Sequence, residues 1–181
     1  LQFVVYTQRK AGRQIQVDKR FVFVYNENKL RRLFSLPIGQ AVWTNWLDTL
    51  ANQYEKIPEE NIGLTSIVRL KDGKIKHIPM IDFGCPCSDA NLREVEKTLL
   101  NLGERRGFVA ESGGSYHYHG LRLFTNQEWC EFMKECKKEA TVDINWPSYQ
   151  INDGFSVLRV STSTSKPNLP KVIAKIGNFK F

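Results

Sequence analysis

Long hydrophobic runs are absent from this 181-residue chain. A membrane-spanning helix needs about 20 consecutive apolar residues, so we expect no membrane association through such a helix. The opening segment LQFVVY is too short for a secretory signal peptide and lacks both a basic lead and a small-residue cleavage site. We therefore expect a cytoplasmic protein.

Cysteine is scarce, with four residues at Cys85, Cys87, Cys130 and Cys136. Their spacing lacks the two-residue knuckle that is typical of structural zinc sites. Free thiols are expected in a reducing cytoplasm, and Cys130 and Cys136 lie in a helical pattern where buried packing explains them. A zinc site that combines cysteines with His117 and His119 remains an alternative.

Acidic residues are absent from residues 155–181, which hold five Lys and Arg residues. Residues 1–35 carry eight basic residues against two acidic ones, so both ends of the chain are more basic than the formal net charge of +7 suggests. If the two ends meet in the fold, they form a basic surface suited to the phosphates of DNA or RNA. Dispersed charge that only keeps the protein soluble explains the same counts.

The composition is that of a globular protein, with 41% hydrophobic and 25% charged residues. We expect one domain over residues 1–181, with a basic β-rich part at 1–60 and a core that carries the polar motifs at 64–173. We find no internal repeat and no low-complexity segment.

Local patterns predict both strands and helices. Short β-branched and aromatic runs predict strands at 3–8, 13–17, 20–25, 153–163 and 171–176. Two hairpins are predicted, at 64–83 with its turn at Asp72-Gly73 and at 107–124 with its turn at Gly113-Gly114. Helices are predicted at 39–54, from Ser88 to a stop at Gly103, and from Thr125, which begins a capping box. This order predicts an α+β fold, a mainly antiparallel sheet with helices packed on one face.

Polar residues stand where predicted strands end. Asp82 closes the apolar strand IPMIDF, where a carboxylate on a rigid support suits Mg²⁺ or Mn²⁺. An ordinary turn or cap residue is the other interpretation. Asp143, followed by Arg159 and Lys166, adds a second carboxylate and two cations suited to a triphosphate, although surface ion pairs would give the same pattern.

The stretch ESGGSYHYHG holds the third cluster. Ser112, Gly113, Gly114 and Ser115 form a turn whose backbone N–H groups and hydroxyls can bind phosphate oxygens. His117 follows and shares one side of a strand with His119. A phosphate site, a transition-metal site and a plain hairpin all fit this stretch.

Taken in order, these clusters resemble the motifs of the archaeo-eukaryotic primase superfamily, the primase-polymerase fold. Its second motif, Ser-x-His, matches Ser115 and His117, and its third, an apolar residue then Asp, matches Val142 and Asp143. Asp82 matches the first acid of its first motif. The resemblance covers about residues 64 to 173.

The resemblance implies a role for each matching residue. Asp82 and Asp143 would hold Mg²⁺ or Mn²⁺, His117 and the Ser112–Ser115 turn would bind the incoming nucleotide, and Arg159 and Lys166 would contact phosphates. It further implies a nucleotidyltransferase of the primer-synthesis type in DNA replication. The second acid of the first motif is replaced by Gly84, which favours nucleotide binding over polymerisation because the family's two-metal chemistry uses three carboxylates. An interaction module with no nucleotide is the remaining alternative.

Overall fold

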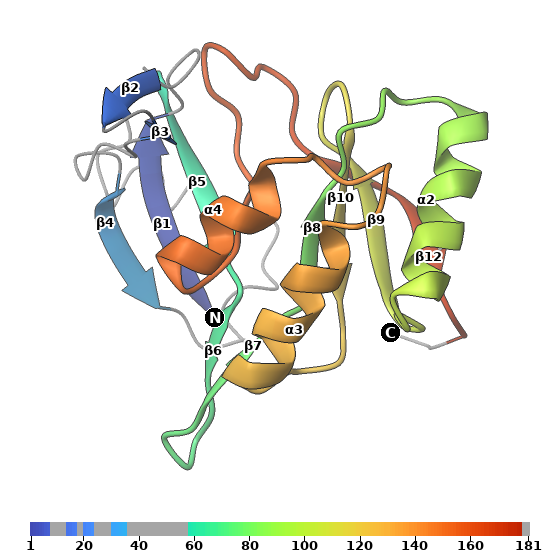
Figure 1. Ribbon diagram of the computed structural model, residues 1–181, viewed down its shortest axis with the longest axis horizontal. Coiled ribbons are helices and arrows are strands. Elements are labelled where there is room, and N and C mark those ends of the chain that lie inside the picture. The colour runs from blue at the N-terminus through green and yellow to red at the C-terminus, as the bar shows by residue number, and fades with distance from the viewer. Residues whose placement is uncertain (8–13, 18–19, 24–29, 36–57, 179–181) are drawn as a thin grey trace.

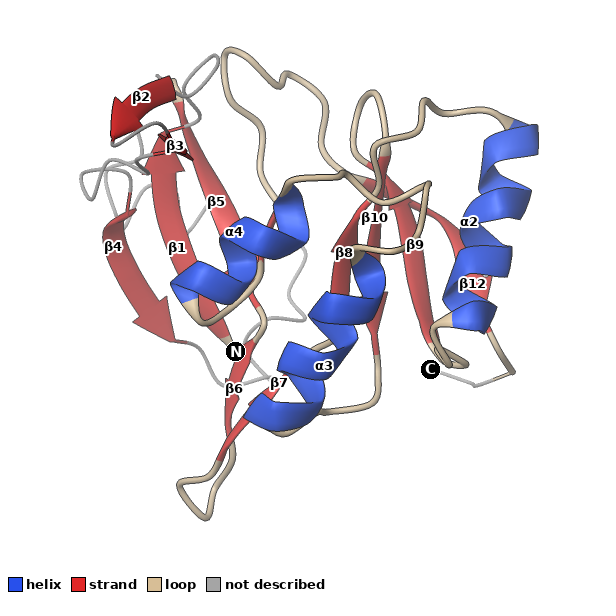
Figure 2. Ribbon diagram, in the orientation of Figure 1, coloured by secondary structure: helices blue, strands red, loops and turns tan. Residues whose placement is uncertain are grey.

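The computed structural model describes residues 1–7, 14–17, 20–23, 30–35 and 58–178. It is an α+β protein built from antiparallel strands and helices (Figure 2). In chain order the elements are β1 (Gln2–Thr7), β2 (Gln14–Val17), β3 (Arg20–Phe23), β4 (Leu30–Ser35), β5 (Glu60–Thr65), β6 (Ile67–Arg69), β7 (Ile75–His77), β8 (Met80–Asp82), α2 (Asp89–Asn101), β9 (Gly107–Glu111), β10 (Tyr116–Gly120), α3 (Asn126–Cys136), α4 (Trp146–Asp153), β11 (Val157–Arg159) and β12 (Lys171–Ile176).

Two four-stranded sheets form the framework, in the orders β11-β5-β1-β4 and β12-β9-β10-β8. Every pairing in them is antiparallel. Two separate hairpins, β2-β3 and β6-β7, complete the strands of the described residues. The sheets lie side by side, and the β6-β7 hairpin projects from one end of the molecule (Figure 1).

Helices α2 and α3 cover one face of the β12-β9-β10-β8 sheet (Figure 1). Their apolar stripes supply Val95 and Leu99 from α2 and Trp129 and Met133 from α3, all fully buried. These side chains pack with the sheet residues Ile81, Val109 and Tyr118 in one hydrophobic core. The predicted fold class is therefore confirmed, since helices pack on one face of an antiparallel sheet.

Several local predictions are confirmed. Ser88 caps α2 by accepting from the Asn91 amide at 3.2 Å. Thr125 and Glu128 form both halves of a capping box at the start of α3. Strands β1, β2, β3 and β12 fall within the predicted ranges or one residue beyond them. The predicted helix at 39–54 lies outside the described residues, and the single-domain prediction over 1–181 stays a prediction.

Two local predictions need correction. The predicted hairpin at 64–83 is divided, because only β6 and β7 pair around Gly73 while β8 leaves to join β10 in another sheet. The sequence patterns predict no helix at Trp146–Asp153, but this segment forms α4. Pro147 in its first turn and Gly154 after its end, at φ 77°, are the usual signals for such a helix.

Among the described residues, no helix combines the length and apolar character that crossing a membrane requires.

Candidate functional site

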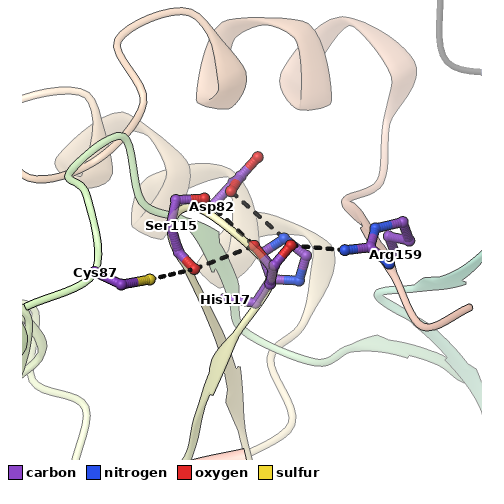
Figure 3. A network of polar contacts seen from close by, with 6 residues as sticks. Asp82, Cys87, Ser115, His117 and Arg159 are labelled. Atoms are coloured by element: carbon purple, nitrogen blue, oxygen red, sulfur yellow. Dashed lines mark hydrogen bonds and ion pairs between the residues drawn. The ribbon is translucent and has the colours of Figure 1, made fainter. Parts of the chain in front are cut away.

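The candidate site is built on the antiparallel pairing of β8 with β10. The register places Asp82 directly opposite His117, so both side chains project from the same face of the sheet. His117 Nε2 lies 3.6 Å from Asp82 Oδ1 (Figure 3). The His117 side chain is 8% exposed and that of Asp82 is 31% exposed, so the carboxylate is the part that a ligand can reach.

Asp143 is brought to Asp82 by the backbone. Phe83 and Val142 form an isolated antiparallel bridge, and the Asp143 amide donates to the Asp82 carbonyl at 3.0 Å. Asp143 Oδ1 accepts from the amides of Asn145 and Trp146, at 3.0 Å each. One carboxylate oxygen thus fixes the chain at the start of α4.

The two carboxylates repel each other. Burial and, second, the charge on Asp143 raise the pKa of Asp82 to about 7, against the lowering effects of Lys166 and Arg159. A bound cation would neutralise the negative charge of this pair and relieve the repulsion between the two carboxylates. Both predicted cations therefore lie close enough to influence the acidic pair.

His117 is a neutral side chain in this site. Burial lowers its pKa to about 3, helped by His119, Arg159 and Lys166, so the contact with Asp82 is no ion pair at neutral pH. His119 lies on the same side with its ring 6.5 Å from that of His117, and burial lowers its pKa to about 4. The Nδ1 atoms of both rings are buried without a hydrogen-bond partner.

The turn between β9 and β10 is closed by its two serines. Ser112 N donates to Ser115 O at 2.9 Å, and the two hydroxyl oxygens are 3.3 Å apart. Gly113 has φ 102°, a conformation that favours glycine. A Cβ at Gly114 would meet nothing within 4 Å, so the tip of the turn is open to a ligand.

Arg159, at the end of β11, is buried, and its side chain points toward Ser115 and His117 (Figure 3). Its guanidinium donates to three backbone carbonyls, those of Ser161, Asn168 at 2.8 Å and Ser112 at 2.7 Å. Lys166 ends a tight turn in which its backbone exchanges two hydrogen bonds with Ser163. Sequence patterns gave no sign of these carbonyl contacts, because they depend on where two distant loops meet.

Gly84 lies against the acidic pair. Its amide donates to Thr141 O at 2.8 Å, and a Cβ built on it would be 3.3 Å from Asp143 Cα. Asp89, the next acidic residue after Gly84 in the sequence, is exposed in the first turn of α2. Within residues 58–178 and the described strands before them, no group of three or more His, Cys, Asp and Glu residues could hold a metal.

The four cysteines are free thiols. Cys136 is buried in the core, as its helical pattern predicted. Cys87 donates to Ser115 O at 3.4 Å (Figure 3), and burial raises the pKa of its thiol. The Cys87 thiol therefore adds a hydrogen bond that holds the Ser112–Ser115 turn in place.

Comparison with known proteins agrees with the resemblance found in the motifs. The sequence model of a family described as archaeo-eukaryotic primase 1D-like matches residues 44–171. No curated protein and no solved structure matches the chain. The family match spans most of the chain and includes Asp82, Ser115, His117, Asp143 and Arg159. The chain belongs to the archaeo-eukaryotic primase 1D-like family.

Proposed function

We propose that this primase-like domain binds a nucleoside triphosphate together with Mg²⁺ or Mn²⁺. The observation that carries the proposal is the convergence of Asp82, His117 and Asp143 from three separate segments, linked by the β8–β10 register and by the Asp143–Asp82 backbone bond. Lys166 adds positive charge to the same place, as its effect on the pKa of Asp82 indicates.

The acidic pair suits one hard divalent cation. Carboxylate oxygens are the ligands that Mg²⁺ and Mn²⁺ prefer. A bound cation would also relieve the repulsion from Asp143 that adds to the effect of burial on the pKa of Asp82. Asp143 uses Oδ1 for the start of α4 and offers its second oxygen. When bound, the cation would neutralise phosphate charge.

The phosphates would lie over the Ser112–Ser115 turn. Its open tip at Gly114 allows close approach, and hydroxyl and backbone N–H groups bind phosphate oxygens without a charge. The neutral imidazole of His117 would donate a hydrogen bond, and Lys166 would supply the charge. Basic residues at both ends of the chain would bind the backbone of DNA or RNA, with an affinity that falls as salt rises.

Nucleotidyl transfer in primer synthesis is the second candidate function. The family assignment favours it, whereas Gly84 leaves two carboxylates where three support two-metal chemistry. Binding without incorporation is therefore the form of the proposal that the side chains support best.

Isothermal titration of the protein with ATP and dATP, with and without Mn²⁺, tests the proposal. We expect saturable binding that requires the cation and weakens by at least about tenfold in Lys166→Met. Arg122→Met is the matched control, since Arg122 lies beyond the far end of β10 over the Phe124 ring. Absence of binding by a folded protein, at any cation concentration, would contradict the proposal.

A primer-extension assay separates the two candidates. Incorporation that disappears in Asp82→Asn would favour transfer. Binding with no incorporation on DNA or RNA templates would favour a binding module.

A further inference from the structure

Arg159 joins two loops that are far apart in the sequence. One is the Ser112–Ser115 turn, through the Ser112 carbonyl, and the other is the segment 161–168, through the carbonyls of Ser161 and Asn168. The first loop ends in Ser115, the serine of the Ser-x-His motif, and the second carries Lys166. A single side chain thus connects both predicted phosphate-binding segments.

The environment of Arg159 favours this structural connection over direct exposure to a ligand. The residue is 5% exposed, and Ser112 and Ser161 are equally buried. A buried guanidinium stays charged and requires hydrogen-bond acceptors, which the three carbonyls supply. The planar fork of arginine donates to several acceptors at once, whereas the ammonium of lysine is a point charge.

Other hydrogen bonds hold the second loop against β5 and the residues before it. Ser161 Oγ accepts from the Ile62 amide at 2.7 Å, and the Thr164 amide donates to Pro58 O at 2.8 Å. These bonds attach the loop to β5 and to the residues before it. Arg159 supplies the connection on the other side, toward the Ser112–Ser115 turn.

We propose that Arg159 is a positioning residue, which holds the Ser112–Ser115 turn and the Lys166 loop at the spacing that a triphosphate requires. This inference rests on the proposed function, and it differs from the sequence-based prediction that Arg159 contacts phosphates itself. A direct phosphate contact would act independently of Lys166, whereas positioning acts through Lys166 and its loop.

Arg159→Lys keeps the charge and loses the fork, so it tests whether the fork of Arg159 contributes to binding. Because a bidentate phosphate contact would also need the fork, the double-variant cycle and hydrogen exchange described below distinguish the two roles. Titration with ATP and Mn²⁺ should show at least about tenfold weaker binding by Arg159→Lys. Arg122→Lys is the matched control and should bind as the wild type does. Wild-type affinity in Arg159→Lys would overturn the inference.

A double-variant cycle with Lys166→Met provides a readout that a general loss of stability would not produce. If Arg159 acts by positioning Lys166, the loss caused by Arg159→Lys should be clearly smaller in the Lys166→Met background than in the wild type. Losses that multiply to within about twofold would mean independent contacts and would overturn the inference.

Hydrogen exchange tests the connection without any nucleotide, so its result is independent of the proposed function. Arg159→Lys should raise exchange at the Ser112 and Lys166 amides together while α3 stays protected. If the variant fails to fold, the wild type still decides the matter. The two segments should open with the same free energy in the wild type, and independent opening would overturn the inference.

Discussion

The amide of Asp143 donates a 3.0 Å hydrogen bond to the carbonyl of Asp82. This bond joins two carboxylates that are far apart in the sequence and holds them together although they repel each other. The pair therefore depends on the backbone for its geometry, and either side chain can be changed without removing the link that aligns them.

Asp82→Asn should weaken Mn²⁺ binding by at least about tenfold. Mutation of a residue that only supports a metal ligand already weakens metal binding by about this factor, and Asp82 would be a ligand itself. The same change should leave the metal-free protein as stable as the wild type or more stable, since it removes the repulsion with Asp143. Titration with Mn²⁺ and urea unfolding measure the two effects. Unchanged Mn²⁺ affinity would exclude Asp82 as a ligand.

Asp143 should show two separable roles. Asp143→Asn keeps an oxygen that accepts from the Asn145 and Trp146 amides, whereas Asp143→Ala removes it. We expect Asp143→Ala to be less stable than Asp143→Asn by about 1 kcal/mol, as for a lost helix cap, while both lose Mn²⁺ binding. Urea unfolding compares them, and equal stability would mean that the amide contacts contribute little.

Gly84→Asp should add a third carboxylate, but at a steric cost. The new Cβ would lie 3.3 Å from Asp143 Cα, so we expect a loss of about 1 kcal/mol from crowding. Gly84→Ala carries the same crowding without the charge and is the matched control. Mn²⁺ should bind more tightly to Gly84→Asp than to Gly84→Ala, and equal affinities would contradict the idea that position 84 faces the cation.

His77 should make the protein less stable in acid. Its ring is buried, stacked 4.8 Å from that of Trp129, and its Nδ1 lies 3.0 Å from Ser66 Oγ. Burial lowers the pKa of His77, so the unfolded chain, with a histidine pKa of about 6.5, binds this proton more readily. The stabilising contribution is complete above that pH and is lost as the pH falls through it.

His77→Asn removes the titrating group. The wild type should therefore lose stability relative to His77→Asn as the pH falls below about 6.5, by up to about 1.4 kcal/mol per pH unit. Urea unfolding of both proteins between about pH 7 and 5 measures this difference. A difference that stays constant over this range would show that the pKa of His77 is the same in the folded and the unfolded protein.

Much of the fold was predictable where the signals are local. The caps at Ser88 and Thr125 and the turn at Gly113 depend on neighbours a few residues away, and short-range chemistry determines them. The α4 helix has local signals too, in Pro147 and Gly154, but its eight residues are too few for an apolar periodicity that predicts a helix.

The site was only partly predictable for a different reason. The order of motifs identified Asp82, Ser115, His117 and Asp143 as a group because the family uses that order. The contacts of Arg159 with Ser112 and Asn168 join loops that only the complete fold brings together, and no local pattern records them. The closeness of Gly84 to Asp143 was hidden for the same reason.

The register of β8 on β10 has one further consequence, for protein engineering. Because side chains alternate along a strand, deletion of Tyr116 would shift His117 to a core-facing position and Tyr118 to the position opposite Asp82. The projecting β6-β7 hairpin bears no such constraint (Figure 1). A fluorescent label or affinity tag is therefore best inserted at Asp72-Gly73, where the chain can lengthen without disturbing the alignment of Asp82 with His117.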